Sequence, residues 1–182
     1  MKPLLRVIAP ATGAMLATSA MAQPVDPQIA ALVEAWVAEE GADFSELVRT
    51  YGGQCLTPVV GALAEAPRQA IIAAGGIEAG IAALQTTDPA AVAALMPGLQ
   101  ECIETLFVGE QVLAWLQAEG GALTPEALQT ATFCYMDAVR PLPTESKQMI
   151  VQAENFEAGA NAVVGLGGTV GTELAARLET CS

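Results

Sequence analysis

The segment VEAWVAEEG at residues 33–41 returns as VLAWLQAEG at residues 112–120, 79 positions later. The same shift, with no gap, places residues 26–103 on residues 105–182. It aligns the following pairs: Cys55 with Cys134, Cys102 with Cys181, Trp36 with Trp115, Leu63 with Leu142, Gln69 with Gln148, Ile71 with Ile150, and Glu78-Ala79-Gly80 with Glu157-Ala158-Gly159. An ungapped register that carries every cysteine and both tryptophans predicts a duplicated unit.

The repeated unit is expected to be helical, because alanine, leucine and glutamate recur at helical spacing while β-branched alternation is scarce. Asp26 followed by Pro27 is typical of a helix start. The apolar stripe behind it is Ile29, Leu32, Val33, Trp36 and Val37, and it predicts a helix that ends near Gly41. The fold class predicted from the sequence is all-α.

Further helices are placed by caps, glycines and prolines. Asp43-Phe44-Ser45-Glu46 is typical of a capping box, and it predicts a second helix that ends at Gly52-Gly53 and a short third helix over residues 55–65. A continuous or kinked helix is expected over residues 67–84. The next begins at Asp88-Pro89 and is expected to break or bend at Pro97-Gly98. The second half is expected to have helices over residues 124–134, 144–164 and 169–181, with a loop at residues 165–168.

The domain organisation follows from the register. Residues 23–103 form the first copy and residues 104–182 the second, each about 79 residues long. One helix over residues 99–119, about 31 Å long, is expected to join them without a linker. We therefore expect two tandem disulfide-stapled helical repeats packed as one compact pseudo-twofold domain.

The start of the chain has the pattern of an export signal. Lys2 and Arg6 give a charged start, an apolar stretch follows, and Ala20-Met21-Ala22 offers a small-x-small cleavage site. Cleavage after Ala22 would leave Gln23 as the first residue of a periplasmic or secreted protein without a membrane anchor. Residues 1–22 are therefore left out of the fold prediction.

The four cysteines favour disulfides, because they form an even number in a chain expected to be exported. Four cysteines allow three pairings, and each is compatible with a pseudo-twofold arrangement. A unit that folded before duplication would have carried its own bridge, which favours Cys55 with Cys102 and Cys134 with Cys181. The chain has no histidine and no Cys-x-x-Cys pair, so the commonest zinc and redox patterns are missing.

Charge and composition exclude several functions. The formal net charge is −13, and the segment 1–22 holds two of the seven bases and none of the 20 acids, which leaves −15 for the rest of the chain. Nucleic acids and anionic membranes are disfavoured because clustered lysine and arginine are missing. A hydrolase triad has no histidine to use, and the glycine-rich run at residues 165–171 lacks the Lys-Ser/Thr ending of a phosphate loop. No cofactor, metal site or catalytic residue is predicted.

Two aligned pairs remain as candidates for a cleft. Trp36 and Trp115 lie among aliphatic residues, where tryptophan is usually part of the core, yet they are also suited to line a cleft between the copies. Glu78 and Glu157 would form a carboxylate pair if the copies faced each other. Any site is expected where the two copies meet.

The function that fits best is an exported helical binding or protein-interaction protein, with an unknown protein or small ligand as partner. The layout of small exported helical units with two cysteines about 48 residues apart resembles that of small periplasmic acid-stress chaperones. That resemblance implies, as an alternative, a holdase that acts when the 20 carboxylates neutralise at acid pH; no residue role is carried over from it. A carboxylate-dependent enzyme built on Glu78 and Glu157 is the second alternative.

Overall fold

The computed structural model of the chain describes residues 26–119 and 123–181, so the predicted signal and its cleavage site at Ala22–Gln23 lie outside the described residues. The described residues form helices and no strand, which confirms the all-α prediction. The helices are α1 (Pro27–Glu40), α2 (Glu46–Gly61), α3 (Glu65–Ala74), α4 (Ile77–Thr87), α5 (Pro89–Glu119), α6 (Pro125–Val139), α7 (Thr144–Gln152), α8 (Phe156–Gly165) and α9 (Gly168–Glu179).

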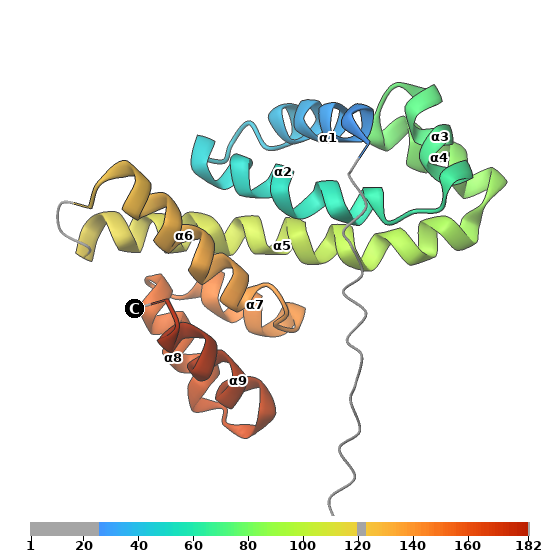
Figure 1. Cartoon of the computed structure of the whole chain (residues 1–182). Helices are drawn as coiled ribbons and strands as arrows, with labels where there is room; N and C mark the ends of the chain where they lie inside the picture. The colour runs from blue at the N-terminus through green and yellow to red at the C-terminus, as the bar shows by residue number, and fades with distance from the viewer. Residues whose placement is uncertain (1–25, 120–122, 182) are drawn as a thin grey trace, which may run out of the picture.

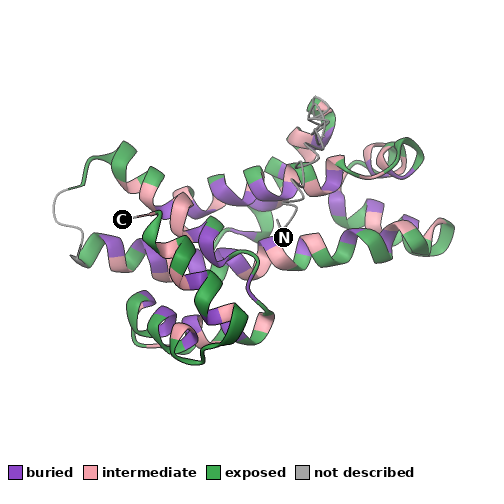
Figure 2. Ribbon diagram, turned by 60° about the horizontal axis from the view of Figure 1, so that its bottom comes forward, coloured by how far each residue is buried: buried purple, intermediate pink, exposed green. Residues whose placement is uncertain are grey.

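The long helix α5 is the axis of the molecule (Figure 1). Helices α2 and α4 pack on one part of it, with α1 and α3 against them, and α6, α7 and α8 pack on the other part, with α9 against α6 and α8. The inward faces of the helices carry the buried residues and the outer faces the exposed ones (Figure 2). Two clusters of buried residues result, one on each part of α5.

The first core contains, among others, Ile29, Val33, Val48, Leu56, Val60, Ile71, Ile77, Leu84, Leu95 and Leu99. The second core contains, among others, Val108, Val112, Leu116, Val139, Ile150, Phe156, Val163 and Leu174. In the middle of α5, residues of the two cores alternate along the helix. Leu106 and Leu113 belong to the first core, while Val108 and Val112 belong to the second. One helix therefore serves both cores.

Length and composition alone would also let α5 cross a membrane over Pro89–Ala118, as they would for many core helices. Here α5 packs against α2, α4, α6, α7 and α8. It also carries Glu101, Glu104 and Glu110, each of which bonds to a residue of another element. In this structure α5 therefore acts as the central core helix.

The helix starts follow the side-chain caps in the sequence. Asp26 caps α1 by accepting a bond from the Gln28 amide at 2.9 Å, and Thr124 caps α6 by accepting one from the Ala127 amide at 3.2 Å. In the Asp43–Glu46 segment the N-cap of α2 is Ser45. The backbone amide of Ser45 also donates to the Glu110 carboxylate of α5 at 2.6 Å, which ties the start of α2 to the central helix.

The prediction that the second helix ends at Gly52-Gly53 is wrong, and so is that of a separate helix over residues 55–65. Helix α2 runs without a break from Glu46 to Gly61. Gly52 is buried where α2 crosses its neighbours, and a Cβ there would lie 3.3 Å from side-chain atoms of Leu106 and Val37. This glycine allows close helix packing rather than ending the helix.

The predicted single helix over residues 67–84 is also wrong, because α3 and α4 are separate. Helix α3 ends at Gly75, whose φ of 72° is the left-handed conformation that glycine adopts easily. In the second half the single helix over residues 144–164 is likewise two, α7 and α8. Asn155 caps the start of α8 by accepting a bond from the Ala158 amide at 2.8 Å. The second half therefore separates its two helices with a capping side chain, where the first half uses a glycine pair.

The expected break at Pro97-Gly98 does not occur, and the connecting helix is therefore longer than residues 99–119. Helix α5 is continuous through Pro97 for 31 residues. Leu95 and Leu99, on either side of the proline, are 2% and 3% exposed in the first core, and this packing holds the helix together across it. The last helix differs slightly too, since α9 covers Gly168–Glu179 and Cys181 follows it.

Two disulfides staple the helices. Cys55 of α2 is bonded to Cys102 of α5, and Cys134 of α6 is bonded to Cys181, with Cα–Cα distances of 5.8 and 5.6 Å. These are the pairs favoured from the sequence. The first bridge is buried in the first core, whereas both cysteines of the second are partly exposed. Two intramolecular disulfides are compatible with an oxidising compartment outside the cytoplasm.

Candidate functional site

An apolar groove lies between α1, α4 and α5 and has a volume of about 510 Å³. We call it the Trp36 groove. Its apolar lining is Trp36, Ile81, Ala82, Met96, Leu99 and Ile103, and its polar lining is Glu78, Gln85, Gln100 and Glu104. Small-molecule sites typically have this size, an apolar lining and a few polar groups.

The wall of the groove is built by the close packing of α4 on α3. Gly80 is buried against Ile71, where a Cβ would lie only 2.7 Å from the Ile71 Cα. Ile77 and Leu84 of α4 enter the first core, while Ile81 is half-buried and Ala82 and Gln85 stay exposed along the groove. The glycine contact therefore sets the depth at which α4 lies and leaves one of its faces open.

Helix α5 supplies the opposite wall. Leu99 is buried, Ile103 is half-buried, and Met96 is 45% exposed, which makes it one of the few large apolar side chains on the described surface. An exposed methionine is a flexible and polarisable contact for an apolar group. The groove therefore offers a buried apolar floor and an adaptable rim.

A second, smaller hollow of about 280 Å³ shares Trp36 and Glu78 with the groove. It continues the groove towards the end of α1, where Glu39 and Glu40 are also part of its lining. Among the described residues that line the two hollows, none is a lysine or an arginine. The carboxylates of Glu39, Glu40 and Glu78 therefore lie at the α1 end of the two hollows, whereas the α5 end is apolar except for Glu104, which is paired with Lys147.

Trp115, 79 positions after Trp36, has different surroundings. Its ring packs edge-on against Tyr135 at 5.3 Å and tilted against Phe156 at 5.4 Å between centroids. At the equivalent positions of the first half the chain has Leu56 and Ile77. A hollow of about 240 Å³ lies beside Trp115, but aromatic rings pack its ring into the second core. Of the two tryptophans, only Trp36 lines a large apolar groove.

Glu78 and Glu157 are not brought together. Glu78 lies in the first turn of α4 and Glu157 in the first turn of α8. These helices pack into different cores and lie at separate parts of the molecule (Figure 1). Trp36 and Glu78, by contrast, line the same groove, so two of the four candidate residues share one site.

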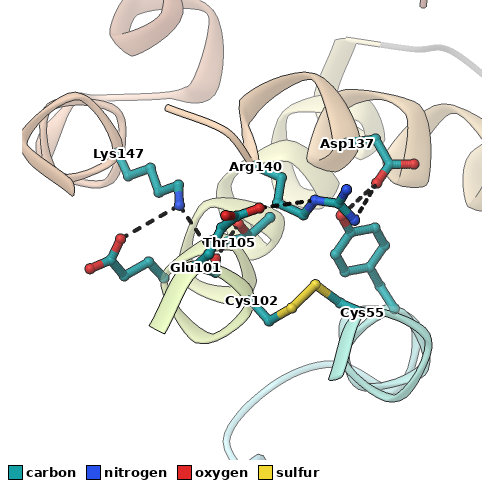
Figure 3. The surroundings of a disulfide bond; sticks show 9 residues. Cys55, Glu101, Cys102, Thr105, Asp137, Arg140 and Lys147 are labelled. Carbon is teal, nitrogen blue, oxygen red and sulfur yellow. Dashed lines mark hydrogen bonds and ion pairs between the residues drawn. A yellow bond between two sulfur atoms is a disulfide. The ribbon is translucent and has the colours of Figure 1, made fainter. Parts of the chain in front are cut away.

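A polar seam joins α6 and α7 to α2 and α5, and sequence reasoning missed it. The Tyr51 hydroxyl donates to the Asp137 carboxylate at 2.7 Å, and the Arg140 guanidinium lies 3.2 Å from the Glu101 carboxylate and 3.7 Å from that of Asp137 (Figure 3). Burial and the neighbouring Asp137 raise the pKa of Tyr51 well above its usual value, so the hydroxyl keeps its proton.

Lys147 completes the seam. It is 3% exposed, and its ammonium lies 3.5 Å from the Glu104 carboxylate and donates to the Glu101 carbonyl at 3.4 Å. Burial lowers the pKa of Lys147, while the nearby carboxylates oppose that effect. Although burial alone would raise the pKa of Glu104, bonds from Gln100 and Thr144 and the Lys147 ammonium together hold it below its usual value.

The only sequence signal for this residue was that Lys147 is the single lysine of the chain after Lys2. Its partners lie more than 40 positions earlier, and the crossing of α7 over α5 brings them together. A buried lysine needs such partners to remain charged. The seam is therefore a structural contact between the two parts of the chain.

Other parts of the described chain differ from the Trp36 groove. A larger hollow, of about 720 Å³ between α1 and α2, is lined by both signs of charge through Glu34, Glu46 and Arg49. The described residues contain no group of three or more cysteine, aspartate or glutamate side chains arranged to hold a metal ion. The Trp36 groove, by contrast with the larger hollow, combines an apolar lining with carboxylates and no basic residue.

No family model, curated protein or solved structure matches this chain. The groove can bind an apolar group, and the residues around it supply hydrogen-bonding amides and carboxylates.

Proposed function

We propose that this chain is an exported binding protein of the bacterial periplasm that holds its ligand or partner in the Trp36 groove. The observation that supports it best is the groove itself, a mostly apolar hollow with a volume of about 510 Å³ that no other part of the described chain fills. Concave, mostly apolar surfaces with a few polar groups are typical of ligand sites. The two disulfides are compatible with export, and the N-terminal residues have the pattern of a signal.

The proposal includes a duplicated scaffold. Helices α2, α3 and α4 begin at residues 46, 65 and 77, and α6, α7 and α8 begin at 125, 144 and 156, each 79 positions later. Gly80 against Ile71 and Gly159 against Ile150 are matching close contacts, with Cβ-to-Cα distances of 2.7 and 2.6 Å. We infer that two related units share α5, and that the first unit kept an open groove while aromatic residues filled the second.

A capture experiment tests the binding function. The mature protein, from Gln23 to Ser182 with both disulfides formed, is immobilised and exposed to periplasmic extract, and bound proteins and small molecules are identified by mass spectrometry. The variant Ala82→Trp fills the groove from an exposed position, and Ala83→Trp places the same side chain on the same helix outside the groove.

We expect a ligand or partner that the wild type and Ala83→Trp retain and that Ala82→Trp loses. Circular dichroism and thermal melts confirm first that both variants are folded. Retention of the same molecules by both variants would place binding elsewhere, and capture of nothing by any of the three would contradict a binding function.

The acid-activated holdase is the second candidate, and the seam favours it. Three carboxylates, those of Glu101, Glu104 and Asp137, hold α6 and α7 to the rest of the chain. Protonation at low pH removes these charges, so the apolar surface beneath them would open. The test is suppression of client aggregation at pH 3 but not at pH 7; equal aggregation with and without the protein would rule it out. The carboxylate-enzyme alternative has no paired Glu78 and Glu157 to support it.

A further inference from the structure

We propose that the ligand of the Trp36 groove is a small amphipathic cation, with an apolar chain or ring and one ammonium or guanidinium group. This inference rests on the proposed binding function and adds the chemical class of the ligand. It is carried by the arrangement of the two hollows, whose apolar and acidic ends meet at Trp36 and Glu78.

The apolar end fits the body of such a ligand. Ile81 of α4 and Met96, Leu99 and Ile103 of α5 line a volume of about 510 Å³, and the carboxylate that α5 adds there, that of Glu104, is already paired with Lys147. A ligand that covers these side chains removes apolar surface from water on both partners, at about 25 cal/mol for each Å² buried. This apolar contact strengthens binding but does not discriminate between a cationic, an anionic and a neutral ligand.

The acidic end selects the charge. Glu78 lies between the two hollows because it lines both, and Glu39 and Glu40 line the smaller one. No basic residue lines either hollow among the described residues, so these carboxylates are not neutralised within the site. A cationic group would supply the missing charge, whereas an anion would meet three like charges.

Trp36 adds a second reason for a cation. The indole ring lines both hollows and so stands at the junction where the head group of a ligand would lie. The face of an indole attracts a cation within about 6 Å of the ring. Trp36 is also half-buried rather than fully covered, which leaves part of its ring available to a ligand.

The second half of the chain keeps a half-buried tryptophan, Trp115, and the glutamate equivalent to Glu78, Glu157, but the rest of the site differs. Trp115 is packed by Tyr135 and Phe156, and the positions equivalent to Met96 and Glu39 hold Ala175 and Ala118. The hollow beside Trp115, about 240 Å³, corresponds to the smaller hollow beside Trp36 and has a single carboxylate, Glu154, in its lining. One binding site per chain is therefore expected, at Trp36.

Fluorescence of Trp36 tests the proposal. The variant Trp115→Phe keeps an aromatic ring in the second core and leaves Trp36 as the single tryptophan. In this background the protein is titrated with decyltrimethylammonium, with decyl sulfate and with a neutral decyl glycoside, each below the concentration at which it forms micelles. We expect one saturable site for the cation, with binding about tenfold or more tighter than for the anion at low salt and a smaller difference at high salt.

Charge variants separate the groove from the general acidity of the protein. Glu78→Gln removes one carboxylate of the groove, and we expect it to weaken cation binding about fivefold while leaving the neutral probe unchanged. Glu145→Gln makes the same change of net charge at an exposed position of α7 outside the groove and should have no effect. Thermal melts control for folding.

The outcomes are distinct. If the anion or the neutral probe binds as tightly as the cation, or if Glu145→Gln weakens binding as much as Glu78→Gln, the selection for a cation is wrong although the groove still binds. If a basic amphipathic peptide changes Trp36 fluorescence and the small cation does not, the ligand is a protein segment and the small-ligand proposal is wrong. If no probe changes Trp36 fluorescence and the capture experiment also finds nothing, the binding function itself fails.

Discussion

Single glycines control how closely the helices approach, and two of them give opposite predictions. Gly80→Ala would put a Cβ 2.7 Å from the Ile71 Cα and should destabilise the protein by about 1–3 kcal/mol. Gly53 lies inside α2 with no atom within 4 Å of its Cβ position, so Gly53→Ala should stabilise the protein by up to about 1 kcal/mol. Urea unfolding measures both changes, and a stabilising Gly80→Ala would contradict the close contact.

Glu104 gives a pH-dependent prediction at the seam. Its folded-state pKa is held below its usual value, so its contribution to stability is present above the unfolded pKa of about 4.5 and is lost as the pH falls through the folded pKa. Glu104→Gln should therefore lose about 1–2 kcal/mol at pH 7, and less as the wild-type carboxyl becomes protonated. Unfolding free energies from pH 7 to pH 3 measure this.

Glu145→Gln is the control for this prediction, because it makes the same substitution at an exposed residue and should change stability by less than about 0.5 kcal/mol. A loss of stability in Glu104→Gln that stays constant down to pH 3 would mean that the side chain matters for its packing and not for its charge.

Part of the candidate site could be predicted at this scale. The duplication aligns Trp36 and Glu78 with a second tryptophan and a second glutamate, which makes them candidates, and both line the groove. The pairing of Lys147 with Glu104 was not predictable, because two side chains so far apart in the sequence meet only through the crossing of two helices. Local patterns identify candidate residues, whereas long-range contacts decide which of them share a site.

Among the elements, helix starts could be predicted better than helix ends. Asp26-Pro27 and Thr124-Pro125 begin α1 and α6 as expected, because a cap acts within its own turn. Gly52-Gly53 and Pro97-Gly98 suggested breaks that tertiary packing overrides, since both pairs lie in helices buried against neighbours. Gly75 does end α3, where the chain is exposed and can adopt a positive φ.

The two disulfides should differ in what they stabilise. Each spans a sequence separation of 47 residues, for which a chain-entropy model gives about 4 kcal/mol. Cys55→Ala with Cys102→Ala removes a buried bridge between α2 and α5 and should lower the unfolding free energy of the whole molecule by up to that amount. Cys134→Ala with Cys181→Ala should instead release α9 locally.

Hydrogen exchange read by mass spectrometry distinguishes the two cases. We expect faster exchange confined to residues 168–181 when the second bridge is removed, because Cys181 ties the end of α9 to α6. When the first bridge is removed we expect faster exchange in α1 to α5 as a group. Uniform exchange changes in both variants would mean that the two parts of the chain unfold as one unit.

For the whole molecule, the sharing of α5 means that the seam decides how the two parts stay together. Beneath the seam, Phe133 packs edge-on against Tyr51 at 5.4 Å, and Met136 lies completely buried beside Gly109. This apolar surface stays covered only while α6 lies on α2 and α5. The charges of Glu101, Glu104 and Asp137 should therefore control its exposure.

At acid pH we expect α6 and α7 to move away from α2 and α5 before the helices unfold. Most of the 20 carboxylates are protonated between about pH 5 and pH 3, and the seam then loses its anions while Arg140 and Lys147 keep their positive charges close together. The expected result is greater binding of a hydrophobic dye and a larger radius of gyration by small-angle X-ray scattering, with helical circular dichroism retained.

The variant Glu101→Gln/Glu104→Gln/Asp137→Asn tests whether the seam causes this opening, because it removes the same three charges at neutral pH. It should bind the dye at pH 7 and change little on acidification. The control Glu145→Gln/Glu157→Gln/Glu173→Gln has the same net charge, but its substitutions lie at exposed positions outside the seam, so it should behave as the wild type does. If both triple variants open at the same pH as the wild type, general charge rather than the seam governs the transition, and the acid response would then be a property of the strongly negative net charge of the chain.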